Sequence, residues 1–464
     1  MIQSHFRQFS LCAPLFMPVL QSTPGEGPAL GDDRIIQDDI TSGALTFDEI
    51  RAAGLKIFAT SFNRFDGYGD GPMNSGDTLN PGGRPTLQDN GTFLRVNGLD
   101  AQTCMECHSV GSNLTVPFTF AIGGVGGSNS NVIFQPTDID VSDSLGNGFA
   151  SFNGRFINAP FVFGTGGIEL LGKEMTRELQ ELKNQAFQFQ GVPVPLFTHG
   201  VSFGSITYDP QLGEFDVSDV EGIDADLVVR PFGRKGEVAT VRGFSIGALQ
   251  FHHGMQPVEV VGRGIDRDGD GVTDEILVGE LSALHIFNTN LERPEIREFT
   301  LEARRGFTTF GAIGCAECHM PRLLTQSRTL FYSFPEVETE PFANAFYQSD
   351  LHDGPAGFAL SAGGGLEIPL FSDMKRHDMG PDLAETFGSP LDSFYITAKL
   401  WGVADTAPYL HDGRATTLTD AIVLHGGQGA AARDQFQNLT DVEKIELLAF
   451  LRSLRTPEDP AGDL

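Results

Sequence analysis

The stretch Cys104-Met105-Glu106-Cys107-His108 determines how the rest of the chain is interpreted, and its pattern returns at Cys315-Ala316-Glu317-Cys318-His319. Two thiols three positions apart can add to the two vinyl groups of a porphyrin, and the adjacent histidine then lies under the iron as its proximal ligand. A redox pair or half of a zinc site preceding a histidine would share this spacing. Because the pattern occurs twice, we interpret it as two covalent c-type haem sites, with His108 and His319 as iron ligands.

Length and composition predict two folded units. A chain of 464 residues with 40% apolar composition can bury a full core but exceeds one ordinary domain. We expect a first haem domain over residues 43–290 and a cytochrome c-like second haem domain over residues 291–464, each with one motif. A signal peptide over residues 1–22 and a linker over residues 23–42 precede them.

The amino-terminal segment resembles an export signal. Arg7 supplies a thin positive region, and the apolar run from Phe9 to Leu20 is too short to span a bilayer. A disordered arm is the alternative. Since c-type attachment takes place outside the cytoplasmic membrane, we expect a periplasmic or otherwise extracytoplasmic protein. Cleavage would remove Cys12, and the other four cysteines are all assigned to haem.

The net charge limits the kinds of partner that the protein can bind. With 61 acidic and 31 basic residues the formal net charge is -30, which argues against nucleic acid and anionic membrane surfaces. It suits a basic redox partner, such as a small cytochrome or a cupredoxin, and either peroxide or a small oxidisable substrate.

Local patterns predict a mainly α fold with irregular loops and a small β insertion. Thr46 with Glu49, and Thr440 with Glu443, form capping boxes that open helices. Apolar spacing predicts further helices over residues 168–186, 281–290, 297–310 and 417–424. Glycine-rich residues 122–147 predict irregular loops, and residues 192–238 predict short strands.

The carboxyl-terminal part resembles a known family. Thr406-Ala407-Pro408-Tyr409-Leu410-His411-Asp412-Gly413, together with Leu400-Trp401-Gly402 and His425-Gly426-Gly427, is similar to the bacterial di-haem cytochrome c peroxidase superfamily, and most of all to its branch of di-haem oxidoreductases. The likeness covers both haem motifs, the Asn158-Ala159-Pro160 segment and about the last 65 residues. It implies two cytochrome c-like haem domains and peroxidase-type activity.

The resemblance also implies the ligands of the second haem. In the peroxidases a methionine fourteen residues beyond the PYxH histidine is the distal ligand, and here that position, counted from His411, is His425. Imidazole in place of thioether would lower the haem potential. The alternative is that His425 only caps a short helix. Trp401 is the sole tryptophan and lies in the second unit, whereas the peroxidases carry their bridging tryptophan in the first; it could line the inter-haem path or be a core residue.

At the first haem the resemblance implies an open site. The position of the family's removable distal histidine, counted back from Asn158, is Ala150. His252 and His253 remain alternative ligands. Gln256-Pro257-Val258-Glu259 resembles the segment that supplies the distal glutamate in peroxidases, so Glu259 is the catalytic candidate for moving protons on peroxide. An exposed glutamate without a role is the competing interpretation.

Two calcium sites are expected. Asn158, Thr406 and Pro408 match the residues that hold an inter-haem calcium in the peroxidases. Asp266, Asp268, Asp270 and Asp274 follow the D-x-D-x-D-G spacing that gathers carboxylates around calcium. The twelfth position is Leu277 rather than glutamate, and an acidic turn without metal is the alternative.

Three functions fit these residues. The first is an exported di-haem oxidoreductase that reduces hydrogen peroxide at a five-coordinate haem, with electrons relayed through a second, bis-histidine haem. The second is a two-haem electron-transfer cytochrome without a substrate of its own. The third is a haem-dependent oxidase of a protein or organic substrate.

Overall fold

The structure is a computed structural model that describes residues 27–69, 103–108, 110, 125–126, 131–140, 151–386, 391–462 and 464. The predicted signal peptide with Cys12, the first residues of the linker, and Ala150 lie outside these residues. Within the described part, no helix is both long enough and apolar enough to cross a membrane.

The mainly α fold class predicted from the sequence is wrong. The described residues combine ten α-helices with several small sheets, so the fold is mixed. The helices are α1 (Gln37–Thr41), α2 (Phe47–Ala59), α3 (Thr165–Gln188), α4 (Val241–Ala248), α5 (Val258–Val261), α6 (Val278–Thr289), α7 (Leu301–Ala312), α8 (Leu418–Val423), α9 (Ala430–Asn438) and α10 (Asp441–Arg452).

Three antiparallel sheets have three strands each. Their orders are β1-β2-β3, β4-β5-β6 and β11-β12-β8. The strands are β1 (Val125–Gly126), β2 (Asn131–Asp140), β3 (Ser151–Asn158), β4 (Val194–Thr198), β5 (Val201–Asp209), β6 (Glu214–Asp216), β8 (Leu323–Leu324), β11 (Ala359–Leu360) and β12 (Leu366–Ile368). Strands β1 and β2 lie where glycine content predicted only loops, because β2 pairs with the later strand β3.

Four further sheets are two-stranded antiparallel pairs. They join β7 (Glu295–Ile296) to β17 (Leu454–Arg455), β9 (Thr329–Ser333) to β10 (Ala345–Asp350), β13 (Arg376–Asp378) to β16 (Phe394–Ile396), and β14 (Glu385–Thr386) to β15 (Leu391–Asp392). Such short pairs leave too little alternation in the sequence to be recognised as strands.

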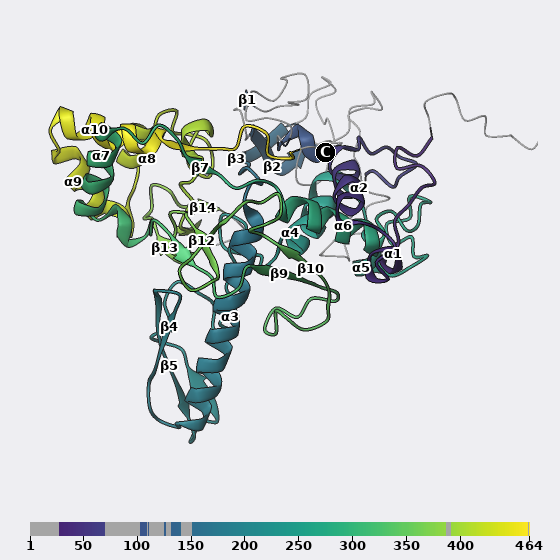
Figure 1. Ribbon diagram of the computed structural model, residues 1–464, viewed down its shortest axis with the longest axis horizontal. Coiled ribbons are helices and arrows are strands. Elements are labelled where there is room, and N and C mark those ends of the chain that lie inside the picture. Colours follow the sequence, from purple (N-terminus) through teal and green to yellow (C-terminus); the bar gives the residue numbers. More distant parts are fainter. Residues whose placement is uncertain are drawn as a thin grey trace, which may run out of the picture.

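Helix ends agree with the capping predictions. Thr46 caps α2 and Thr440 caps α10, and in both helices the capping box is complete. The predicted helix over residues 168–186 is part of the long α3 (Figure 1). Helix α7 begins at Leu301 rather than at residue 297, because Thr300 accepts a hydrogen bond from the Ala303 amide and so caps it.

The two motifs lie against separate hydrophobic clusters. Cys104 and Met105 pack with α2 and α6, at the end of the molecule where the carboxyl terminus also lies, whereas Cys315 packs with α7 and α10 at the opposite end (Figure 1). A third cluster along α3 includes Trp401. The carboxyl-terminal Ala461 belongs to the first cluster, and its carbonyl accepts a hydrogen bond from Arg51 at 2.9 Å. The proposed domain boundary at residue 290 stays a prediction.

Helices α7 and α10 cross so closely that one glycine fixes their distance. A Cβ added at Gly306 would lie 1.9 Å from the Glu446 carbonyl oxygen, whereas a Cβ at Gly311 in the same helix would meet nothing within 4 Å. The helix that precedes the second motif is therefore locked against the carboxyl-terminal helix through Gly306.

The substitution Gly306→Ala should lower the free energy of unfolding by about 1–3 kcal/mol, because the backbones must separate. Gly311→Ala is the matched control and should be neutral or stabilising by about 0.5–1 kcal/mol. Denaturant unfolding of both variants measures the difference. Equal effects would show that the crossing tolerates a methyl group.

Candidate functional site: two cysteine–histidine motifs

Both motifs adopt the same local structure. Cys104–Glu106 and Cys315–Glu317 each form one 3₁₀ turn, and the four cysteines are half-buried and free of disulfides. The amide of the motif histidine donates to the carbonyl of the first cysteine, at 3.0 Å for His108 and 2.9 Å for His319. Each turn therefore presents two thiols and a histidine from one compact segment.

The second motif faces His425. The ring centroids of His319 and His425 are 6.3 Å apart. In each ring Nδ1 is paired with a backbone carbonyl, that of Phe371 for His319 at 3.1 Å and that of Ala421 for His425 at 2.8 Å. With Nδ1 as the donor, the Nε2 lone pair of each ring is left available to a metal.

The electrostatic environment keeps both rings neutral. Burial, followed by the charge of His425, lowers the pKa of His319 to about 4. Burial likewise lowers the pKa of His425. Metal–nitrogen bonds of about 2 Å on each side would place two ring centres roughly 6 Å apart, so the spacing and protonation of these rings fit a bis-imidazole iron.

Glycines after His425 allow this approach. A Cβ on Gly426 would lie 2.6 Å from the Met379 carbonyl oxygen, and one on Gly427 would lie 2.2 Å from the Asp378 carbonyl oxygen. The His425-Gly426-Gly427 pattern thus has a steric cause: the backbone after β13 packs directly on it. The methyl group of Met379 lies near Gly429 in this same contact.

His377 adds a positive charge beside the second motif. Its Nε2 lies 2.8 Å from an Asp373 carboxylate oxygen, and Cys318 belongs to the same cluster. Although burial alone would lower it, the pKa of His377 is raised to about 10 by its hydrogen bonds to Asp373 and Cys318. The sequence assigned this histidine no role. Asp373 is only four residues away along the chain, but Cys318 is brought near by folding.

The first motif has a different surrounding. Burial lowers the pKa of His108 to about 4, against the opposing effect of the Pro160 carbonyl. Among the described residues, the ring in contact with His108 is that of Phe58, at 6.4 Å between centroids. His253 is buried, and its Nε2 lies 3.9 Å from the Cys104 sulfur.

Glu259 lies on α5 and forms an ion pair with Arg242. Two guanidinium nitrogens of Arg242 lie 2.9 and 2.6 Å from one Glu259 oxygen, and a third donates to the Ser282 hydroxyl at 2.9 Å. Arg242 is fully buried, while the Glu259 side chain is 16% exposed. The proposed catalytic role of Glu259 stays a prediction, and Arg242 is the partner that the sequence did not reveal.

The other predicted site residues are placed as follows. The Asn158 amide nitrogen donates to the Pro408 carbonyl at 2.7 Å, so these two residues of the expected inter-haem calcium site meet. Thr406 instead donates to the Val403 carbonyl at 3.4 Å. Trp401 is buried and packs over Gly164 and Phe358. None of these contacts tests calcium binding.

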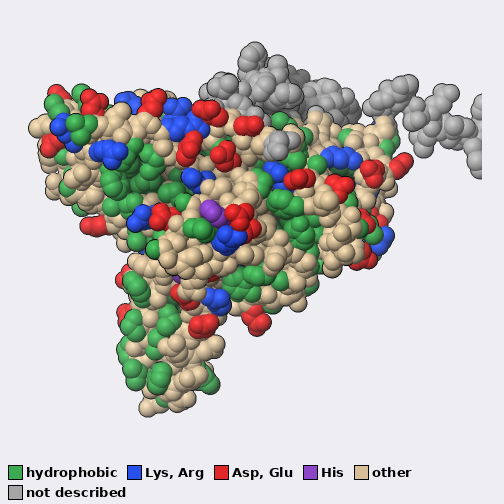
Figure 2. All heavy atoms as spheres, in the orientation of Figure 1, with side chains coloured by type: hydrophobic (Ala, Val, Ile, Leu, Met, Phe, Trp, Pro, Cys, Tyr) green, Lys and Arg blue, Asp and Glu red, His purple; other side chains and the backbone are tan. Residues whose placement is uncertain are grey.

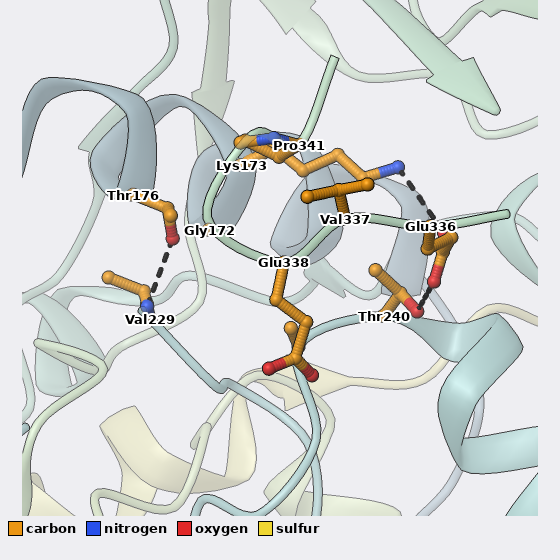
Figure 3. A pocket seen from close by; sticks show the side chains of 10 residues that line it. Gly172, Lys173, Thr176, Val229, Thr240, Glu336, Val337, Glu338 and Pro341 are labelled. Atoms are coloured by element: carbon orange, nitrogen blue, oxygen red, sulfur yellow. Dashed lines mark hydrogen bonds and ion pairs between the residues drawn. The ribbon is translucent and has the colours of Figure 1, made fainter. Parts of the chain in front are cut away.

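A buried charge network along α3 was not expected. Glu169 contacts His285 at 2.9 Å and Lys173 at 2.7 Å. Lys173 and Glu336 also line a small hollow (Figure 3). Burial raises the pKa of Glu336, whereas the pKa of Glu169 is lowered by His285 and Lys173 despite its burial. Because Lys173 already supplies positive charge here, this cluster is a poor cation site.

Comparison with known proteins agrees with the second site. Residues 261–454, which include the second motif and His425, match the family model described as "Di-haem oxidoreductase, putative peroxidase". The two motifs and this match support a haem-dependent oxidoreductase. That segment is therefore similar to the di-haem oxidoreductase family, which confirms the resemblance drawn from the sequence. The family's description implies two haems.

More distant similarities are weak. No curated relative matches the chain. Hydrazine synthase from Kuenenia stuttgartiensis aligns at 18% identity over 39% of this chain and 57% of that chain, with a TM-score of 0.24. A MauG-like protein associated with microbial copper homeostasis aligns at 18% identity over 57% and 79% of the chains, with a TM-score of 0.28. The chain thus spans little more than half of the hydrazine synthase chain, and TM-scores this low define no shared fold.

The Arg242–Glu259 ion pair should contribute more to the free energy of unfolding than an ion pair at the surface does. Glu259→Gln leaves the buried guanidinium without its countercharge, so the free energy of unfolding should fall by about 2–4 kcal/mol. Glu446→Gln removes the partner of Arg305, whose side chain is 60% exposed, so the guanidinium stays hydrated and the loss should be about 0–1 kcal/mol. Denaturant unfolding of the two variants compares them, and equal losses would contradict the buried ion pair.

Proposed function

We propose that this chain is an exported di-haem c-type oxidoreductase that reduces hydrogen peroxide. The haem held by His108 is the reactive centre, and the haem held by His319 and His425 relays electrons. The observation that carries the proposal is a difference between the motifs. Each motif histidine has a phenylalanine ring 6.4 Å away, Phe58 for His108 and Phe310 for His319, but among the described residues only His319 also faces a second imidazole, that of His425.

Covalent attachment is supported by the cysteines. Each pair lies within one turn beside the proximal histidine, and the thiols are not joined to one another. Addition of these thiols to porphyrin vinyl groups would tether each haem with its iron against His108 or His319. Since such attachment takes place outside the cytoplasmic membrane, the proposal includes an extracytoplasmic location.

The second site is suited to electron transfer. Haem supplies one-electron redox chemistry when bound. The chain's contribution is to hold two imidazoles in fixed orientation through the Phe371 and Ala421 carbonyls. A site closed from both sides admits no substrate, and two imidazoles favour a lower potential than a histidine–methionine pair.

The first site needs a source of protons. Reduction of peroxide to two waters consumes two protons as well as two electrons, and Glu259 is the proposed carboxylate for this transfer. Its partial exposure leaves it a contact with solvent, and Arg242 holds its orientation at 2.6 Å. Arg242 is thus proposed as the positioning residue for Glu259.

Aromatic residues lead from the first site toward the second half of the chain. Phe161 and Phe163 stack at 5.4 Å, directly after Pro160, whose carbonyl lies near His108. A Cβ on Gly402 would approach the Phe161 ring at 3.1 Å, and Trp401 precedes this glycine. We propose that electrons pass between the sites through this region. The net charge of -30 suits a basic protein as the electron donor.

One observation favours the electron-carrier alternative. His253 lies beside Cys104, so a small displacement could bring its imidazole to the first iron. A carrier of this kind would not consume peroxide. His253→Ala would then open the first haem and give it high-spin character, whereas in the proposed enzyme the wild-type haem is already open.

Peroxide consumption tests the function directly. Mixing the reduced holoprotein with one equivalent of hydrogen peroxide should oxidise both haems, because each molecule of peroxide takes two electrons. Stopped-flow absorption measures the reaction, and His253→Ala should react no faster than the wild type. Failure of the wild type to react, with a gain of reactivity in His253→Ala, would establish the carrier instead.

The ligand of the second haem can be tested by its potential. His425→Met should raise that potential, because Met/His ligation raises it relative to two imidazoles. His411→Gln is the control, since His411 stacks on Tyr395 with centroids 4.6 Å apart and is not a proposed ligand. Spectroelectrochemical titration compares the variants; an unchanged potential in His425→Met would exclude His425 as a ligand.

A further inference from the structure

The loop between α5 and α6 gathers carboxylates that the redox chemistry does not use. Asp266, Asp268 and Asp270 each place a carboxylate oxygen within 4.8 Å of the others. Gly271, at the sixth position of this loop, has a φ of +95°. The same position in calcium-binding EF-hand loops is glycine, because the chain must turn sharply there. An acidic cluster of this kind is by itself common at protein surfaces.

Glu275 supplies an independent observation. Its side chain is only 2% exposed, and its Oε1 has no hydrogen-bond partner. Its other oxygen accepts a hydrogen bond from the Gln256 amide at 2.7 Å. The carboxyl group is close enough to the three aspartates for their charges to act on it. A buried, half-satisfied carboxylate facing further negative charge is unfavourable unless it takes up a proton or a cation balances it.

We propose that Asp266, Asp268, Asp270 and Glu275 bind one calcium ion. In an EF-hand the glutamate at the twelfth position is a calcium ligand. Here Glu275 supplies that carboxylate, so the twelfth position can be Leu277. The donor set consists of oxygen alone, which hard cations prefer and zinc or copper do not. Calcium accepts irregular arrangements of six to eight oxygens, whereas magnesium requires a near-ideal octahedron.

The site would brace the first haem motif. Glu275 fixes the Gln256 amide, and the Ile276 carbonyl accepts from the Val258 amide at 2.9 Å. A Cβ on Gly67 would lie 2.3 Å from the Glu275 side chain, so the segment after α2 packs on this carboxyl. Gly69 in turn donates to the His253 carbonyl at 2.8 Å. Calcium would therefore hold the segment with Gly67 and Gly69 against the segment that begins at Gln256. Both segments lie next to His253, which is beside Cys104.

Calcium binding by the holoprotein tests this site. After removal of metal by a chelator, wild type and the variant Asp268→Asn/Glu275→Gln are titrated with calcium chloride by calorimetry. Asparagine and glutamine keep the side-chain volumes, and Asp268→Asn also keeps the oxygen that caps the turn. The wild type should bind one more calcium than the variant, and calcium should raise the melting temperature of the wild type alone by about 5 °C.

Three further variants make the outcome specific. Asp216→Asn alters an exposed aspartate that accepts from the Ser218 amide at 3.0 Å, and it should bind calcium like the wild type. Asn158→Ala removes the other expected calcium site and should retain this one. Should the double variant fail to fold, Glu275→Gln alone should weaken binding at least tenfold. Equal stoichiometry in wild type and variant, or a melting temperature that calcium leaves unchanged, would overturn the proposal; neither result bears on peroxide reduction.

Discussion

The placement of two neutral imidazoles 6.3 Å apart is the constraint on which the second half of the structure depends. His319 is fixed by its own turn and by the Phe371 carbonyl. His425 follows the end of α8, where its ring is paired with the Ala421 carbonyl. Two close backbone contacts accompany this arrangement, one between α7 and α10 and one between the end of β13 and the chain after His425. Gly306, Gly426 and Gly427 allow those distances because they lack a Cβ.

The first motif has the same chemistry in a different setting. His108 is as strongly desolvated as His319, and its pKa is lowered to the same value of about 4. Its described neighbours are aromatic and apolar. His253 lies beside Cys104, and the Arg242–Glu259 ion pair joins α4 to α5. Two similar pentapeptides can thus support different roles, because the residues that complete each site come from distant parts of the chain.

The arm formed by the end of α3 with β4 and β5 stands away from the rest of the molecule (Figure 1). Hydrophobic side chains lie on its surface (Figure 2), among them the exposed Phe189, Phe197 and Leu212. The strands of this arm agree with the β insertion expected over residues 192–238. Neither haem motif lies on the arm, so the sites do not depend on its chemistry.

The features predicted correctly from the sequence are those that depend on residues close together in the chain. The capping boxes at Thr46 and Thr440 and the apolar face of α3 are local patterns, and the structure confirms them. The fold class was wrong because short strand pairs such as β13 with β16 depend on distant partners. For the same reason Glu259 could be singled out but not its partner Arg242, and the acidic loop could be identified without the significance of buried Glu275.

The difference between the two irons is the central claim, and electron paramagnetic resonance of the oxidised holoprotein tests it most directly. One high-spin ferric haem and one low-spin ferric haem of equal intensity are predicted, with peroxide altering the high-spin signal first. Two low-spin signals that peroxide leaves unchanged would contradict it, because both irons would then be closed on both sides.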